Sequence, residues 1–101
     1  MDRIAALRSM LEADPSNTFA RYGLAQECAK SGEREQALAE FKKILESNAD
    51  YQAAYYHAGK VLERLGRKED AQAMYKSGIE ASHRTGDDHA RSELEVALQE
   101  L

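Results

Sequence analysis

The sequence contains no tryptophan, one proline and one cysteine among its 101 residues. A single cysteine, Cys28, cannot form a disulfide within the chain, which favours a reducing compartment. No apolar run approaches the roughly 20 residues of a membrane-spanning helix, and the charged, amphipathic start does not resemble a secretory signal peptide. We therefore expect a cytoplasmic protein with no membrane partner.

Basic residues are outnumbered in this chain. Lys and Arg total 14 against 18 Asp and Glu, so the net charge is −4 with neutral histidines. Non-specific binding to DNA or RNA requires a basic surface, so we expect no nucleic-acid partner. Apolar residues make up 43% and charged residues 32%, a balance typical of one globular domain with a modest core.

Strand signals are sparse, and the apolar residues follow helical periodicity instead. Between Asp50 and Leu65 the apolar side chains recur at the spacing i, i+3, i+4 and i+7, which predicts an amphipathic helix. We expect Asp50 to cap this helix at its N-terminus and Gly66 to end it. The buried stripe consists of Tyr51, Ala54, Tyr55, Ala58, Val61, Leu62 and Leu65.

A repeat of 34 residues organises the chain. Aligning residues 16–49 with residues 50–83 gives eight identities, among them the turn glycines Gly32 and Gly66. Each copy reads as two helices, and Ser16 occupies the capping position equivalent to Asp50. A fixed period of this length indicates stacked helical repeats.

A further helix is expected on each side of the two copies. Residues 1–13 form an amphipathic helix that ends before Pro15, and residues 88–101 form another, capped by Asp87 or Asp88. The last helix fits the repeat best with one extra residue inserted before it. We therefore predict an all-α fold of about six helices in antiparallel pairs, divided into a half repeat (1–14), repeats at 16–49 and 50–83, and a capping helix (87–101).

The period and the placement of small and aromatic residues resemble the tetratricopeptide repeat family. The small residue that opens the family's second helix matches Ala37 and Ala71, and the following aromatic matches Phe41 and Tyr75. The family's closing proline matches Pro15. The pattern is broken at the position favouring tryptophan, which holds Arg21 and then Tyr55, and at the later proline positions, which hold Ala49 and His83.

This resemblance implies a right-handed superhelix that acts as a scaffold, holding a peptide or a partner helix in its concave groove. The residues also indicate such a groove, because Tyr22 and Tyr56 are 34 apart and lie one step round the helix from the buried stripe. The alternative is that both tyrosines belong to the core of a slightly rotated helix. The expected partner-binding residues are Phe19, Tyr22, Gln26, Lys30, Tyr56, His57, Lys60 and Arg64.

The charges near this groove leave its ligand open. Lys30, Lys60, Arg64 and Arg91 favour an acidic ligand, but Glu27 and Glu63 interrupt them. Some chaperone-binding members of the family hold a terminal carboxylate with a lysine–asparagine clamp. The corresponding positions here carry Tyr22, Gln26 and His57, so we do not carry that ligand over.

We expect no enzyme activity, metal or cofactor. The sequence has no glycine-rich phosphate loop, nucleophile elbow or HExxH motif. The cluster of His83, Asp87, Asp88 and His89 matches no strong metal-binding spacing. Cys28 lies on the buried stripe, where it is expected to be a small core residue.

The terminal helices suggest a second possible function. The first helix lacks the partner that would precede it in a full repeat, so it forms either a simple cap or a self-association surface. We expect a monomer or a weak homodimer. The alternative function is a self-assembling structural module that uses the terminal helices.

Overall fold

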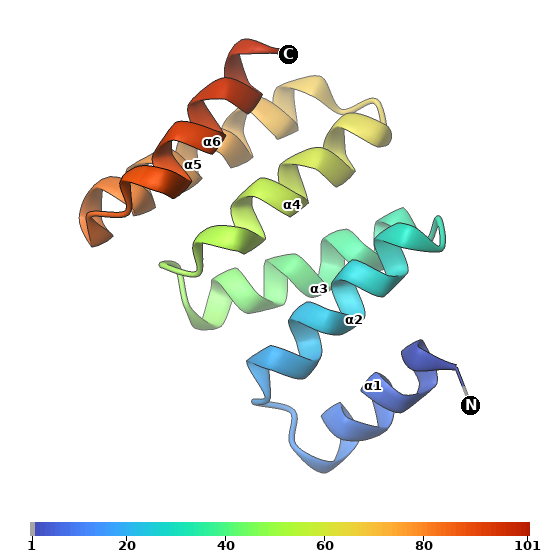
Figure 1. The fold of residues 1–101 in the computed structure, drawn as a ribbon. Helices are drawn as coiled ribbons and strands as arrows, with labels where there is room; N and C mark the ends of the chain where they lie inside the picture. The colour runs from blue at the N-terminus through green and yellow to red at the C-terminus, as the bar shows by residue number, and fades with distance from the viewer. Residues whose placement is uncertain (1) are drawn as a thin grey trace.

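The computed structural model describes residues 2–101, and these residues form six α-helices joined by short turns (Figure 1). Met1, which was assigned to the first predicted helix, lies outside the described residues. No strand occurs in the described part of the chain, so the predicted all-α repeat fold is confirmed. The helices are α1 (Arg3–Ala13), α2 (Thr18–Lys30), α3 (Arg34–Ser47), α4 (Gln52–Arg64), α5 (Lys68–Thr85) and α6 (Asp88–Gln99).

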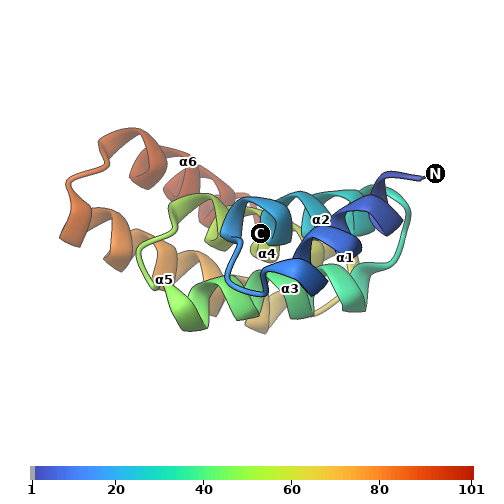
Figure 2. The same ribbon diagram turned by 90° about the horizontal axis from the view of Figure 1, so that it is seen from below.

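The helices stack in two layers. Each helix packs against the next along the chain, while α2 also contacts α4 and α4 contacts α6. Figure 2 shows α2, α4 and α6 on one side of the stack and α3 and α5 on the other. The molecule measures 39 × 29 × 19 Å. Among residues 2–101, no helix combines the length and apolar character needed to span a bilayer.

Small and aromatic side chains pack the space between the layers. Ala37 and Ala71 are fully buried, as are the aromatic rings of Phe41 and Tyr75 that follow them. A small side chain at a crossing lets two helix backbones approach closely, and the aromatic ring fills the space beside it. The small and aromatic positions that the sequence singled out therefore form the core.

Gly59 lies where α4 packs tightly against α5. A Cβ atom at Gly59 would lie 2.2 Å from Cε1 of Tyr75, a distance at which the ring or the helix would have to move. Gly66 serves a different purpose, since it follows the end of α4 with a left-handed φ of 76°, as expected for a helix stop.

Two predicted helix caps are wrong, and both for the same reason. Asn17, not Ser16, caps α2 by accepting a hydrogen bond from the Ala20 N–H at 3.0 Å. Ser16 instead donates its hydroxyl to Asp14 at 2.6 Å. In each case the predicted cap side chain forms a hydrogen bond with another residue, and the next residue along the chain holds the N-cap position.

The second wrong cap is Asp50. Tyr51 holds the N-cap position of α4 without a side-chain hydrogen bond, and the Asp50 carboxylate accepts from Arg84 at 2.8 Å. That pair ties the turn before α4 to the end of α5. The prediction for the last helix is confirmed, since Asp87 caps α6 by accepting from the Ala90 N–H at 3.0 Å.

A partly buried ion pair forms at Arg21, the position where the repeat pattern favours tryptophan. Its Nη1 lies 2.6 Å from Oε1 of Glu40, which is only 4% exposed. Gln36 donates to the other carboxylate oxygen at 2.6 Å, so both oxygens of Glu40 are satisfied. Arg21 also donates to the Pro15 carbonyl at 2.9 Å. The guanidinium thus joins α2 to α3 and to the turn that precedes α2.

Candidate protein-interaction groove

One face of the α2–α4–α6 layer repeats the same side-chain spacing on all three helices. We call this surface the groove face. On α2 it presents positions 19, 22, 26 and 30, and on α4 positions 53, 56, 60 and 64. On α6 and its C-cap the same spacing falls on His89, Ser92, Val96 and Glu100. The eight partner-binding residues predicted from the sequence lie on α2 and α4.

Sequence reasoning missed the α6 part of this face because it misjudged the repeat phase. The buried residues Leu94 and Ala97 correspond to Ala58 and Val61, an offset of 36 residues rather than 34. The expected insertion of one residue before the last helix is therefore wrong, and two are present. The longer α5, with 18 residues, accommodates them before Gly86 turns the chain.

An aromatic cluster joins α2 to α4 at the centre of the groove face. The ring centroids of Tyr22 and His57 are 5.9 Å apart, and those of His57 and Tyr56 are 5.3 Å apart. Tyr22 also packs edge-on against the buried ring of Phe41 at 6.0 Å. Tyr22 and Tyr56 are half-buried, so each ring has one part against the core and another part towards solvent.

Burial changes the acid–base properties of this cluster. It raises the pKa of Tyr22, with a smaller contribution from Tyr51. Burial also lowers the pKa of His57, while the charge of Glu93 on α6 opposes that change. A lowered pKa keeps the imidazole neutral at pH 7, so His57 contributes an uncharged ring.

Phe19 stands apart from this cluster. Its side chain is 77% exposed, the highest value among the large apolar residues that are exposed in the described chain. Burying an aromatic side chain is strongly favourable, and this one gains little from the fold. It is therefore available to a binding partner without any rearrangement of the core.

Lys60 is held at the edge of the groove face by its neighbours on α4. Its Nζ lies 5.5 Å from the centroid of the Tyr56 ring and 3.6 Å from Oε2 of Glu63. The Glu63 carboxylate also accepts the hydroxyl hydrogen of Tyr75. Burial, with the hydrogen bond and charge of Glu63, raises the pKa of Tyr75. This chain of contacts fixes the position of the Lys60 ammonium.

A pocket of about 260 Å³ opens between α4 and α6. It combines apolar surface with both signs of charge. Its lining consists of Tyr56, Lys60, His89, Ser92, Glu93, Val96, Ala97 and Glu100.

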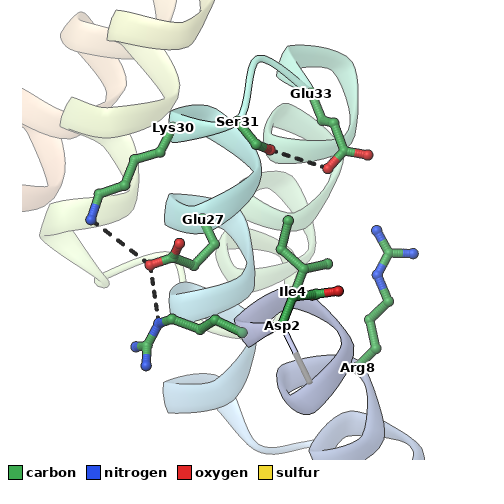
Figure 3. A pocket seen from close by; sticks show the side chains of 8 residues that line it. Asp2, Ile4, Arg8, Glu27, Lys30, Ser31 and Glu33 are labelled. Atoms are coloured by element: carbon green, nitrogen blue, oxygen red, sulfur yellow. Dashed lines mark hydrogen bonds and ion pairs between the residues drawn. The ribbon is translucent and has the colours of Figure 1, made fainter.

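A second hollow, of about 610 Å³, lies between α1 and the end of α2 (Figure 3). Glu27 occupies its wall and pairs with Arg3 at 3.0 Å and with Lys30 at 3.8 Å. The figure shows the Glu27 carboxylate paired with Lys30, and Ser31 hydrogen-bonded to Glu33 above it. Lys30 is thus partly neutralised, which weakens the case for an acidic ligand at this end of the groove face.

The other residues considered as candidate sites are either buried in the core or paired with neighbouring charges. Cys28 is fully buried, and burial raises the pKa of its thiol, with the charge of Glu33 adding to the effect. Arg91, considered as a cation for an acidic ligand, pairs with Asp88 and Glu95, each at 3.4 Å. Across residues 2–101, no three His, Cys, Asp or Glu side chains are placed to hold a metal ion.

The two-layered stack of antiparallel helix pairs defines a helical repeat protein. A family model described as "Tetratricopeptide repeat" matches residues 1–81, and the chain belongs to this family. Tetratricopeptide repeat domains generally mediate protein–protein interactions, which gives the class of function.

Solved structures of similar proteins agree with this assignment. The crystal structure of a tetratricopeptide repeat domain protein from Salinibacter ruber is 41% identical, covering 84% of this chain and 94% of that one, with a TM-score of 0.78. The solution structure from the same organism is 42% identical, covering 86% and 88%, with a TM-score of 0.79. A protein from Bordetella parapertussis is 26% identical over 99% of this chain and 87% of its own, with a TM-score of 0.86. No curated protein matches the chain.

Proposed function

We propose that this chain binds a peptide segment of a partner protein along the groove face, and that it acts by binding rather than by catalysis. The observation that carries the proposal is the aromatic surface across α2 and α4. Phe19 is 77% exposed on α2, one turn before Tyr22, and Tyr22, Tyr56 and His57 form a separate half-buried cluster.

Half-buried tyrosines suit this purpose physically. Tyr22 and Tyr56 already pack against the core, so these two side chains lose little conformational entropy when a bound partner orders them further. Their rings offer apolar area, and their hydroxyls can hydrogen-bond to a peptide backbone. Exposed Phe19 would add the largest newly buried apolar area of the predicted contact residues.

The proposal is tested by comparing wild type with Phe19→Ala and with Tyr22→Ala/Tyr56→Ala in affinity capture from a lysate of the source cell. Bound proteins are identified by mass spectrometry and their affinities are then measured with purified partners. Phe19→Ala is the sharper variant, because its side chain contributes little to the fold. Loss of an interface aromatic should weaken binding at least about tenfold.

Met10→Ala serves as the matched control. Met10 is 43% exposed on α1, which is not one of the three helices that form the groove face. A partner that both Phe19→Ala and the tyrosine variant retain at full affinity would remove the groove face as its binding site. Circular dichroism melts of every variant establish that the proteins compared are folded.

Self-assembly is the second candidate function, and one observation favours it. Within residues 2–101, α1 packs against α2 alone and leaves Met10 exposed. If copies associate through α1, sedimentation equilibrium should give a mass above 11.3 kDa that rises with concentration. Met10→Glu should then restore the monomer. A constant mass of one chain at all concentrations would exclude this candidate.

A further inference from the structure

The charges on the two sides of the pocket between α4 and α6 are of opposite sign. On the α4 side, the lining includes Lys60, whose ammonium lies beside the Tyr56 ring, and Arg64 follows one turn later on α4, beyond the residues that line the pocket. On the α6 side stand Glu93 and, at the helix C-cap, Glu100. With the offset of 36 residues, Arg64 and Glu100 are equivalent positions of α4 and of the C-cap of α6.

These charges are only weakly neutralised inside the protein. Among residues 2–101, neither Arg64 nor Glu100 takes part in an ion pair, and both are exposed. Glu93 is faced by the exposed His89 at 3.6 Å. Lys60 pairs with Glu63 at 3.6 Å and is partly neutralised, so in the part of the chain that the structure describes Arg64 supplies the unpaired positive charge on α4. A positive side and a negative side therefore remain available to a ligand.

The surface between the two charged sides is partly apolar, with Ser92 and His89 among the residues that line it. The pocket there has a volume of about 260 Å³ and includes the Tyr56 ring, the buried Ala97 and Val96, which is 49% exposed. Sites for whole small molecules are usually larger, about 300–1,000 Å³. A pocket of this volume has room for one apolar side chain of a bound peptide.

We propose that the partner segment carries an apolar residue between an acidic and a basic residue. The apolar side chain enters the pocket, the acidic one faces Lys60 and Arg64, and the basic one faces Glu93 and Glu100. Neighbouring helix axes lie about 8–10 Å apart and an extended chain advances about 3.3 Å per residue, so the two charges stand about three residues apart. This inference rests on the proposed function, and it adds the chemistry of the ligand.

The test is selection from a random heptapeptide library displayed on phage, against immobilised protein. Wild type should enrich peptides that have an apolar residue between opposite charges. Arg64→Glu places a carboxylate beside Lys60 and removes the net positive charge of the α4 side, so it should lose the acidic preference and keep the apolar and basic ones. Glu100→Lys should do the reverse. Both substitutions are at exposed positions, which protects the fold.

Lys76→Glu is the matched control, because Lys76 is an exposed lysine on α5, in the other layer. It should select the same peptides as wild type. In fluorescence anisotropy with a selected peptide, each groove reversal should weaken binding about two- to fivefold, the range for a rim ion pair. The loss should shrink at high salt.

The remaining outcomes separate this inference from the function on which it rests. If wild type enriches peptides that Phe19→Ala fails to bind, but the charge pattern is absent or unmoved by either reversal, the inference is wrong and the groove function stands. If no peptide is enriched above background, or the enriched peptides lack the charge pattern and bind both Phe19→Ala and Tyr22→Ala/Tyr56→Ala as tightly as wild type, both are overturned.

Discussion

Individual side chains on the groove face serve the core and the surface together. Tyr22 contacts the buried Phe41 ring, while His57 stacks on the same ring with centroids 6.1 Å apart. His57 also faces Tyr22 on α2 and feels the charge of Glu93 on α6. A titratable ring in such a position makes the stability of the fold depend on pH.

His57 should make the protein less stable in mild acid. Burial holds its pKa below the ordinary value of about 6.5, so the unfolded chain takes up the proton first as pH falls. The free energy of unfolding should then decrease from just above pH 6.5 down to the folded-state pKa, and level off below it. Urea titrations between pH 7.5 and 5.5 measure this slope.

His57→Gln provides the comparison for that slope. The variant removes the titrating group, so its stability should change less across the same pH range than that of wild type. Equal slopes in the two proteins would show that other groups cause the pH dependence.

At this scale the sequence predicted burial better than exposure. The stripe containing Tyr55, Ala58 and Leu62 is buried as the periodicity indicated, because apolar spacing reports directly on which face meets the core. Spacing alone could not assign Tyr22 and Tyr56 to the core or to the groove, since a ring on the border of the buried stripe is both packed and partly exposed. Their role in binding stays a prediction.

Between paired helices, a glycine allows the neighbouring helix or side chain to pack close to the backbone. Gly59 on α4 faces Tyr75 on α5, whereas Gly23 on α2 faces the end of the Leu7 side chain on α1. The two glycines are both helical, yet the atoms opposite them differ in freedom. An aromatic ring locked in the core cannot give way as the end of a leucine can.

Gly59→Ala should therefore destabilise the fold. Alanine favours a helix over glycine by about 1 kcal/mol, but overpacking a core costs typically about 1–3 kcal/mol. The added Cβ would stand 2.2 Å from the Tyr75 ring, so we expect a net loss of about 1–2 kcal/mol in urea unfolding.

Gly23→Ala is the matched control for this substitution. Its Cβ would lie 3.3 Å from Cδ2 of Leu7, which can shift by a few tenths of an ångström. We expect stability between unchanged and about 1 kcal/mol higher, as helix propensity predicts. Equal losses in both variants would show that the close approach of α4 and α5 has no special cost.

The sequence predicted which helices exist but not where all of them begin. Periodicity identified six helices, because a buried stripe repeats many times along each one. A helix start depends on a single hydrogen bond, and Ser16 and Asp50 find other partners in the turns before α2 and α4. The two-residue offset before α6 was missed for a related reason, since no sequence identity marks the extra length of α5.

The whole molecule is a stack in which contacts run between neighbouring helices. Within residues 2–101, α6 contacts α5 and α4, and α1 contacts α2. Stability in such an arrangement is approximately a sum over adjacent units, and end units can open without the rest. A destabilising substitution in an end helix should therefore affect fewer helices than one in the middle of the stack.

Leu94→Ala should loosen the C-terminal end alone. Leu94 is 1% exposed on α6, and truncating a buried leucine costs about 2–5 kcal/mol. Amide hydrogen exchange should accelerate in α6 and in the part of α5 against it, while α2 and α3 keep their protection. Exchange measured residue by residue by NMR tests this.

Ile44→Ala gives the comparison in the middle of the stack. Ile44 is equally buried, at 1% exposed, but it lies on α3 between α2 and α4. Its loss should accelerate exchange in α2, α3 and α4 together. If Leu94→Ala produced the same uniform acceleration, the chain would unfold as one cooperative unit.

Phe19, with 77% of its side chain in water, also has a consequence for how the sequence evolves. Buried residues such as Phe41 are retained by selection for folding, whatever the protein binds. Selection for folding places little constraint on position 19, so mutation is free to remove an aromatic residue there in any lineage that has lost the partner. Among descendants of a common ancestor, the residue at position 19 would then trace the history of the interaction separately from the history of the fold.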